Sequence, residues 1–512
     1  MLVDLGQALS QVLSPQTLLL CVLGVVGGMT VGATPGLSAT VGLALLLPIT
    51  FTMDPTSGLV LMGAFYMGAI YGGSFTAILV NTPGTPSSIA TTFDGYPMTK
   101  AGRSDVAIIA VTMASVAGGL VGVLGLATLA PLLANVVLAF GPQEYFWLGI
   151  FGLTMIAGLA AKSLLKGLAA GFLGLLISTI GISPVGGEVR FTFGSTDMQG
   201  GVPLIIALIG LFTVPTIVDL IVAPEIRSAA MVNEKQQRER RNVLRDTVRD
   251  VLSRPVNLIR SSVIGTLVGI LPGAGGNVAN LIAYNEAKRT SKRSHNFGKG
   301  EVDGVVAPEA ANNAVVGGGL VPLLTLGIPG APPDAVIYGV LLLHGLRPGN
   351  ELFAEQGVLT FTFILAIAVS AVLMAPVGLV AGRGLQRLVV RTPTHYLAPA
   401  IGVLTIVGSY AVRNNPLDVV LMVALGLAGY GLRHLGLPPA AIVLGVVLGP
   451  IIETGFAQGL LAASGSADPW LSFFTRPLSI GIIVLVLLGI AWPILADRKA
   501  RRNTREDEEL PS

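Results

Sequence analysis

Two related stretches of sequence decide the fold of this chain. The first is Tyr71-Gly-Gly-Ser-Phe-Thr-Ala-Ile-Leu-Val-Asn-Thr-Pro-Gly-Thr-Pro-Ser-Ser88, and the second is Gly317-Gly-Gly-Leu-Val-Pro-Leu-Leu-Thr-Leu-Gly-Ile-Pro-Gly-Ala-Pro-Pro-Asp334. In each, a Pro-Gly-x-Pro sequence interrupts an apolar run. An earlier Pro-Gly pair precedes each one, in Gly32-Ala-Thr-Pro-Gly-Leu-Ser-Ala-Thr40 and in Gly269-Ile-Leu-Pro-Gly-Ala-Gly-Gly-Asn277. The same two interruptions therefore occur in the same order in both halves of the chain.

The composition is that of a membrane protein. Of the 512 residues, 52% are hydrophobic and only 12% are charged, whereas a soluble domain carries about 25% charged residues. The 66 glycines and 32 prolines would weaken soluble helices, but in a membrane bundle glycine lets helices approach closely and neighbours satisfy the freed backbone groups. We predict an all-α, polytopic membrane protein with roughly 12 transmembrane helices, some broken or re-entrant, in two repeat-related and inverted halves.

Charged residues divide the chain. The polar stretch 224–260 is rich in arginine, and its apolar residues recur at helical spacing from Leu244 to Leu252. Such a helix lies on a membrane surface, and the positive-inside rule places it in the cytoplasm. This linker is either a solvated connector or a regulatory element. The predicted divisions are a first membrane repeat half at 1–223, a basic cytoplasmic amphipathic linker at 224–260, a second repeat half at 261–496 and a disordered cytoplasmic tail at 497–512.

The charges beside the broken segments favour inverted halves. Basic residues flank both ends of the segment 261–287, as a hairpin that opens to the cytoplasm requires. The segment 16–53 has no Lys or Arg at either end. Because positive residues favour the cytoplasmic side, we expect the two segments to open to opposite sides.

Several classes of protein do not fit this sequence. The single cysteine, Cys21, forms no intrachain disulfide, and no metal-ligand spacing occurs. The net charge of +3 follows from membrane topology, so we expect no nucleic-acid partner. We also expect no cofactor. There is no Walker motif, no Gly-x-Ser-x-Gly and no His-Glu-x-x-His sequence. We therefore predict that the chain is not an enzyme.

Each Pro-Gly pair ends one short helix and lets another begin in a new direction. The backbone exposed at such a break is buried in protein or lines a cavity, because lipid cannot satisfy it. Helix N-termini with small neutral donors form a pocket for an anion, while unwound carbonyl groups and hydroxyls hold Na⁺. Apolar segments broken at matching places are the pattern of a secondary transporter.

The residues near the breaks are the predicted site. Candidates for substrate or ion binding are Ser38, Thr40, Asn81, Thr82, Thr85, Ser87, Ser88, Asn277, Asn280, Asn312, Asn313 and Asp334. Candidates for shaping the backbone are Pro35, Gly36, Pro83, Gly84, Pro272, Gly273, Pro329 and Gly330. Direct ligand or ion contacts are expected from Asn81, Ser87, Asn277 and Asn313. In the alternative interpretation the polar residues only join helices and the Pro-Gly pairs only kink them.

Two acidic residues within apolar segments need separate attention, because buried charge is costly and usually functional. Asp334 either binds a cation or caps the helix that follows it, and capping is favoured. Glu309, before Ala310-Ala-Asn-Asn313, is a candidate proton or ion site.

These motifs resemble those of the large membrane subunit of the tripartite tricarboxylate transporters. The resemblance follows the family's order and covers the chain nearly end to end, although from about Phe361 onward it lies chiefly in hydropathy. The motifs that carry it are Gly32–Leu37, Leu47–Phe51, Met67–Ser74, Asn81–Ser88, Asp94–Met98, Lys100–Arg103, Leu271–Gly276, Pro308–Asn313 and Gly327–Ala331.

The resemblance implies a multi-pass carrier in a bacterial inner membrane. Its partners would be a small membrane subunit of about four helices and a periplasmic solute-binding protein, and its substrate citrate, another tricarboxylate or a dicarboxylate. A Na⁺ or proton gradient would drive import by alternating access at a midplane site, without ATP. The alternative is a carboxylate-selective channel or an uncoupled facilitator, which would show flux without cation coupling.

Overall fold

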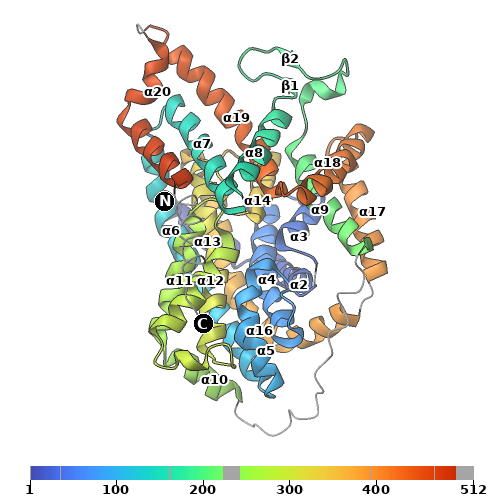
Figure 1. Cartoon of the computed structure of the whole chain (residues 1–512), viewed down its shortest axis with the longest axis vertical. Coiled ribbons are helices and arrows are strands. Elements are labelled where there is room, and N and C mark those ends of the chain that lie inside the picture. The colour runs from blue at the N-terminus through green and yellow to red at the C-terminus, as the bar shows by residue number, and fades with distance from the viewer. Residues whose placement is uncertain are drawn as a thin grey trace, which may run out of the picture. The chain divides into compact units, whose positions relative to one another are not determined.

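The computed structural model describes residues 2–34, 36–160, 163–222, 243–391, 394–465 and 468–491. These residues form helices joined by short connections, with one two-stranded hairpin (Figure 1). The chain divides into two compact units, and each combines two separate stretches of sequence. Unit 1 comprises Met1–Val137 and Phe212–Val419, and unit 2 comprises Leu138–Leu211 and Val420–Ser512.

Unit 1 begins with a first run of helices. Its elements are α1 (Leu2–Val12), α2 (Pro15–Gly32), α3 (Ala39–Phe51), α4 (Pro55–Val80), the 3-10 turn η1 (Pro86–Ser88), α5 (Ile89–Lys100) and α6 (Ser104–Val137). Ser38 accepts a hydrogen bond from the N–H of Val41 at the start of α3, and Asp54 accepts one from Ser57 at the start of α4. Both interruptions of this run fall at the Pro-Gly sequences, as predicted.

The second run of unit 1 is interrupted at the corresponding places. Its elements are α10 (Val243–Leu252), α11 (Pro255–Ile270), α12 (Gly275–Thr290), the turn η4 (Ser294–Asn296), α13 (Asp303–Leu326), α14 (Pro332–Leu343), α15 (Asn350–Ala354), α16 (Gly357–Arg391) and α17 (Thr394–Arg413). α9 (Leu204–Val222) and α18 (Pro416–His434) contain the boundaries between the two units.

Helices at corresponding positions of the two runs make corresponding contacts. α2 packs against α4 as α11 packs against α13, and α2 contacts α16 as α11 contacts α6. In addition, α3 contacts α14 of the second run, and α12 contacts η1 and α5 of the first run. Figure 1 shows α11, α12 and α13 side by side within this unit. Each run therefore places a short helix against the broken segment of the other run.

Glycines make these helix contacts close. Gly28 and Gly32 of α2 lie against the backbone of α4, and Gly265 and Gly269 of α11 lie against the backbone of α13. A Cβ at any of these positions would approach a backbone carbonyl oxygen of the neighbouring helix. Small residues at helix interfaces are characteristic of membrane bundles, where packing rather than the hydrophobic effect holds helices together.

Unit 2 is a smaller helical bundle with a short hairpin. Its elements are α7 (Pro142–Ala160), α8 (Leu164–Ser178), β1 (Gly181–Ile182), β2 (Val189–Arg190), the turn η2 (Asp197–Gly200), α19 (Pro439–Ala462), the turn η5 (Pro469–Leu471) and α20 (Ser472–Thr475). α19 packs against α7 and α8. Ion pairs add to this packing: Arg190 of the hairpin lies 2.8 Å from Glu453 of α19, and Arg476 lies 2.8 Å from Glu144 of α7.

Among the described residues, seven helices are long and apolar enough to cross a membrane. The number rises to eight if the bent pair Pro469–Thr475 and Pro477–Ala491 forms one span. The predicted all-α, polytopic class is confirmed, whereas the predicted count of roughly 12 is not. Apolar helices next to the breaks, such as Ala39–Phe51 and Pro332–Leu343, are too short to span alone and are not among these seven.

The predicted division of the sequence at 224–260 stays a prediction, and each compact unit takes residues from both sides of it. Residues 224–242 and 497–512 lie outside the described residues. The remaining part of the predicted linker contains α10, which buries Val251 and leaves Leu252 exposed. α10 contacts α6 and α11 of unit 1.

Candidate functional site

The Pro-Gly turns of the two runs share a backbone geometry. Gly36 has a φ of 89° and Gly273 a φ of 84°, values in the left-handed region that glycine adopts without strain. The helices before the Pro-Gly-x-Pro sequences also end alike, because Asn81 after α4 has a φ of 56° and Gly327 after α13 a φ of 70°. Each run thus turns out of its helices by the same local conformations.

The glycines of the Pro-Gly-x-Pro sequences sit against backbone. A Cβ on Gly330 would lie 2.7 Å from the carbonyl oxygen of Gly269 and 2.8 Å from Cα of Gly319. A Cβ on Gly84 would overlap the carbonyl oxygen of Gly32. Because backbone atoms cannot move aside as a flexible side chain does, any residue larger than glycine at either position would displace the break itself.

The two breaks of the second run are joined directly. The N–H of Gly273 donates to the carbonyl oxygen of Gly330 at 2.7 Å. Pro272 and Pro329 are buried beside this hydrogen bond, and Pro83 of the first run is half-buried. Pro35 lies outside the described residues.

Polar residues of both runs meet beside α12. The amide nitrogen Nδ2 of Asn280 donates to the carbonyl oxygen of Ser87 in η1. One turn earlier on α12, a Cβ on Gly276 would lie 2.5 Å from Oδ1 of Asn312 and 2.8 Å from Cβ of Ser87. We call Ser87, Gly276, Asn280 and Asn312 the central cluster.

Several polar atoms of the central cluster have no hydrogen-bond partner within the described part of the chain. These atoms are Nδ2 and Oδ1 of Asn312 and Oδ1 of Asn280. Oδ1 of the neighbouring Asn313 also has no hydrogen-bond partner among the described residues. All three side chains are fully buried. Burying an unpaired polar group costs on the order of 1–3 kcal/mol, so such atoms indicate a place that a ligand or ordered water occupies.

Two further predicted residues extend the cluster along the first run. The hydroxyl oxygens of Thr85 and Ser87 lie 3.1 Å apart. The hydroxyl of Ser88 donates to the carbonyl oxygens of Thr85 at 2.9 Å and of Gly73 at 3.1 Å. Ser88 thereby fixes the turn that presents Ser87.

Other predicted residues are not members of the central cluster. Ser38 caps α3, and Thr40 is buried within that helix. The hydroxyl of Thr82 donates to a backbone oxygen two residues earlier. Asn81 and Asn277, which were expected to contact the ligand directly, are exposed.

Asp334 caps α14. Its Oδ2 accepts a hydrogen bond from the N–H of Ala331 at 2.7 Å, and the hydroxyl of Tyr66 on α4 faces the same carboxylate. The side chain is fully buried and lies at the N-terminus of a helix, where the helix dipole favours negative charge.

Glu309 has a different environment in α13. It is fully buried, and its Oε1 accepts a hydrogen bond of 2.5 Å from the hydroxyl of Thr91 on α5. Ser115 on α6 lies beside the same carboxylate. Neither Oε2 of Glu309 nor the hydroxyl oxygen of Ser115 has a hydrogen-bond partner among the described residues.

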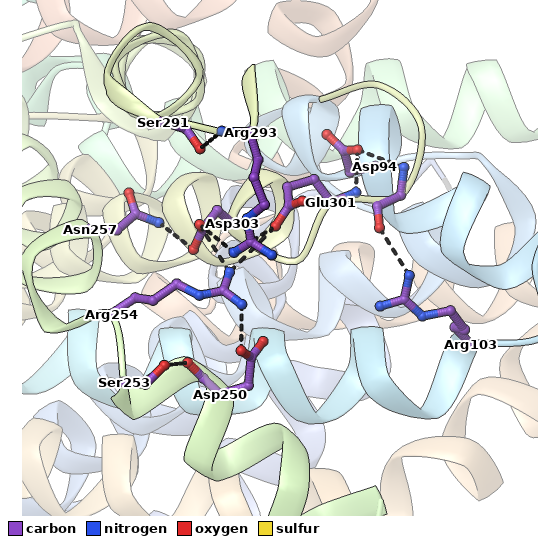
Figure 2. Close-up of polar contacts among 11 residues, drawn as sticks. Asp94, Arg103, Asp250, Ser253, Arg254, Asn257, Ser291, Arg293, Glu301 and Asp303 are labelled. Carbon is purple, nitrogen blue, oxygen red and sulfur yellow. Dashed lines mark hydrogen bonds and ion pairs between the residues drawn. The ribbon is translucent and has the colours of Figure 1, made fainter. Parts of the chain in front are cut away.

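An ionic network lies at the N-terminal ends of α11 and α13 (Figure 2). Arg254 forms ion pairs with Asp303 at 3.0 Å, with Glu301 at 3.4 Å and with Asp250. Arg293, after α12, forms further ion pairs with Glu301 and Asp303. Partial burial acts to lower the pKa of Arg254, but the carboxylates of Asp303 and Asp250 outweigh burial and raise it.

Asp94 of α5 connects this network to the first run. Its buried carboxylate accepts hydrogen bonds from the N–H groups of Gly298, Gly300 and Glu301 at 2.8–3.0 Å. The hydroxyl of Tyr284 on α12 donates to it as well, at 2.9 Å. Hydrogen bonds to a charged acceptor are stronger than those to a neutral one, so Asp94 holds the loop before α13 against α5.

The sequence did not point to Thr91 or Ser115. Each is a small hydroxyl residue within a helix, and nothing local distinguishes it from similar residues that only bond to their own backbone. Asp94 stood within a family motif, but its role depends on a loop far away in the sequence. Only the packing of α5 and α6 against α13 reveals these residues.

Comparison with known proteins identifies the family of this chain. Residues 18–444 match the Tripartite tricarboxylate transporter TctA family. An uncharacterized 52.8 kDa protein in the TAR-I ttuC' 3' region of Agrobacterium vitis is 35% identical over 502 residues, which cover 98% of this chain and 97% of that protein. An uncharacterized protein in the TAR-II ttuC' 3' region of the same organism is 34% identical over 240 residues, 47% of this chain and 97% of that protein. No solved structure matches significantly. This chain therefore belongs to the TctA family of tripartite tricarboxylate transporters.

Proposed function

We propose that this chain is the large membrane subunit of a secondary transporter that imports a carboxylate: citrate, another tricarboxylate or a dicarboxylate. Membership of a transporter family and the apolar helices support this proposal. A periplasmic solute-binding protein delivers the substrate, and a small membrane subunit completes the assembly in the inner membrane of a bacterium. A Na⁺ or proton gradient drives uptake.

The observation that carries the proposal is the set of buried, unpaired polar atoms in the central cluster. A carboxylate accepts hydrogen bonds, and Nδ2 of Asn312 and the hydroxyl of Ser87 are donors. The first N–H groups of α12 have no partner within the helix and add the positive end of its dipole. Gly276 has no side chain, and this lets Asn312 and Ser87 lie close to the backbone of α12. None of these groups carries a full charge, so the substrate binds without being trapped.

The central cluster also suits alternating access. It joins the two runs through the hydrogen bond from Asn280 to the backbone of Ser87. The corresponding helix contacts of the two runs support a repeat, and repeat-built carriers move one part against the other around a fixed site. Movement of α12 away from η1 breaks this hydrogen bond and opens the cluster.

Uptake into proteoliposomes tests the proposal. The vesicles contain this chain with the small membrane subunit and the binding protein that accompany it, and receive radiolabelled citrate and then a panel of dicarboxylates. An inward Na⁺ or proton gradient is imposed without ATP. We expect accumulation above the external concentration that disappears when an ionophore collapses the gradient.

The two other outcomes separate the alternatives. Flux that only equilibrates, with or without the gradient, would indicate a channel or an uncoupled facilitator. Absence of flux for every carboxylate, with binding protein that demonstrably binds one of them, would contradict the proposed substrate class.

A further inference from the structure

Glu309 is a buried carboxylate that needs a cation. Its side chain is fully buried, and within the described ranges no Lys, Arg or His forms an ion pair with it. Removing a carboxylate from water without a partner costs far more than a hydrogen bond returns. Such a group is neutralised by a proton or by a bound cation, and inside a membrane protein it usually serves transport.

The surroundings of Glu309 differ from those of the other buried carboxylate, Asp334. Asp334 is equally buried, and its Oδ1 is also unpaired among the described residues. Its Oδ2, however, accepts the N–H of Ala331 at the start of α14, where the helix dipole favours its charge. Glu309 lies inside α13, away from the helix end, and receives only the hydroxyl of Thr91 at Oε1. The two carboxylates therefore have different requirements.

The surroundings of Glu309 supply oxygen ligands. The hydroxyl oxygen of Ser115 on α6 lies beside the carboxylate and has no hydrogen-bond partner within the described part of the chain. One turn along α13, Nδ2 of Asn313 donates to the carbonyl oxygen of Glu309 at 3.5 Å, and Oδ1 of Asn313 is unpaired. All of these side chains are fully buried. Carboxylate, hydroxyl and amide oxygens are hard ligands of the kind that Na⁺ takes in broken-helix carriers, and they equally accept a hydrogen bond from a protonated carboxyl group.

The ionisable groups around Glu309 do not neutralise it. From α4, Tyr71 lies close enough to Glu309 to interact with it electrostatically, and the Tyr71 hydroxyl is hydrogen-bonded to Thr112 of α6 at 2.6 Å. Asp94 of α5 lies beside Gly304, in the first turn of α13. It already accepts hydrogen bonds from the loop before α13. Both groups are neutral or negative.

We propose that Glu309 binds the coupling cation, a proton or Na⁺, together with Ser115 and Asn313. This inference rests on the proposed function and names the place where the ion gradient acts. Glu309 lies one turn from Asn312 on α13, so a cation at Glu309 changes how α13 packs against α5 and α6 and thereby sets the position of Asn312 in the central cluster. Loading of the ion and of the carboxylate is linked through one helix.

The charge-removing variant Glu309→Gln tests this inference in the complete transporter. Two activities are measured in the same proteoliposomes: gradient-driven accumulation of citrate, and exchange of internal for external citrate without a gradient. We expect accumulation to fall about tenfold or more, while exchange stays close to that of the unchanged protein. Glu355→Gln, the same substitution at an exposed position, is the matched control and leaves both activities unchanged.

The outcomes distinguish this inference from the proposed function. Absence of accumulation in the unchanged protein contradicts the function itself. Accumulation in the unchanged protein that persists in Glu309→Gln overturns the coupling role. Loss of both accumulation and exchange in a correctly folded, monodisperse variant also overturns it, because the charge then serves translocation of the substrate rather than coupling.

A measurement on the unchanged protein avoids dependence on the variant's folding and identifies the cation. Dicyclohexylcarbodiimide, an apolar reagent, modifies protonated carboxyl groups, and mass spectrometry locates the adduct. Modification of Glu309 that increases at low pH and is slowed by Na⁺ indicates a Na⁺ site. Modification that depends on pH but not on Na⁺ indicates a proton site. No modification of Glu309 at any pH, under conditions that modify other carboxyl groups, would overturn the inference.

Discussion

Asn312 is fully buried, and both of its amide atoms are unpaired in the described structure. Asn277, next to Gly276 in α12, is exposed. A hydrogen bond to a charged ligand contributes about 1.5–3 kcal/mol. We therefore predict that Asn312→Ala raises the half-saturation concentration for the carboxylate by about 10–100-fold. Asn277→Ala should change it by less than about twofold. Initial uptake rates over a range of substrate concentrations check both, and equal effects of the two substitutions would contradict the placement of the site.

Asp94 contributes stability rather than substrate contact. Asn at this position keeps the shape, but it loses the charge and turns an N–H donor toward the donors of the loop 298–301. We predict that Asp94→Asn destabilises the protein by about 3 kcal/mol or more, which thermal unfolding of the purified protein measures. Asp197→Asn, at an exposed position in unit 2, is the control. Equal melting temperatures for the two variants would show that the hydrogen bonds of Asp94 contribute little.

The residues of the site were predictable to different degrees. Ser87 and Asn280 stand out in the sequence because they are polar residues close to a Pro-Gly break, and Asn312 because it is an amide within an apolar segment. The sequence does not determine the distances between these residues. The prediction of direct contacts therefore named Asn81 and Asn277, which are exposed, ahead of the buried Asn280 and Asn312. Burial depends on which helices cover a residue, and that is a property of contacts between segments far apart.

Among the helices and turns, the break between α13 and α14 depends on a close backbone contact that leaves no room for a side chain. A Cβ on Gly330 would lie 2.7 Å from the carbonyl oxygen of Gly269. Overpacking typically costs about 1–3 kcal/mol, and here it also displaces the start of α14. We predict that Gly330→Ala reduces uptake about tenfold or more and that Gly330→Val abolishes it, while both variants insert into the membrane.

The control for this prediction is Gly402→Ala in α17, where a Cβ would meet nothing within 4 Å. Alanine is a better helix former than glycine, so this variant should transport normally. Uptake and membrane content are measured for each variant. Normal uptake in Gly330→Val would remove this break from the transport site.

The positions of the breaks followed from the sequence because Pro and Gly act locally on the backbone. The predicted number of roughly 12 spans is not confirmed. Hydropathy does not reveal where a broken segment leaves a helix such as Ala39–Phe51 too short to cross alone. The contacts of α12 with η1 and of α3 with α14 were also beyond the sequence, because they join distant segments.

At the scale of the whole molecule, each unit has a basic end. In unit 1, Arg254 and Arg293 gather at the ends of α11 and α12. In unit 2, Nζ of Lys166, near the start of α8, donates to the carbonyl oxygen of Leu435, while the hairpin with the exposed Phe193 follows the end of α8. From the positive-inside rule we expect the basic end of each unit to face the cytoplasm.

Cysteine labelling in intact cells checks this topology. The buried Cys21 is first replaced by alanine. An impermeant thiol reagent should then label Phe193→Cys from outside, and Ser294→Cys, in the exposed turn η4, only after the cells are opened. Labelling of Ser294→Cys in intact cells would contradict the orientation of unit 1.

Protection of the central cluster by substrate tests where the carboxylate binds. In the Cys21→Ala protein, Ser87→Cys places a thiol between Gly276 and Asn280, and its rate of modification is measured with and without saturating citrate or the dicarboxylate that uptake identifies. We predict that bound substrate slows modification about tenfold, while Ser294→Cys reacts at the same rate in both conditions. An unchanged rate at Ser87→Cys under saturating substrate would contradict the claim that the carboxylate binds where the two broken segments meet.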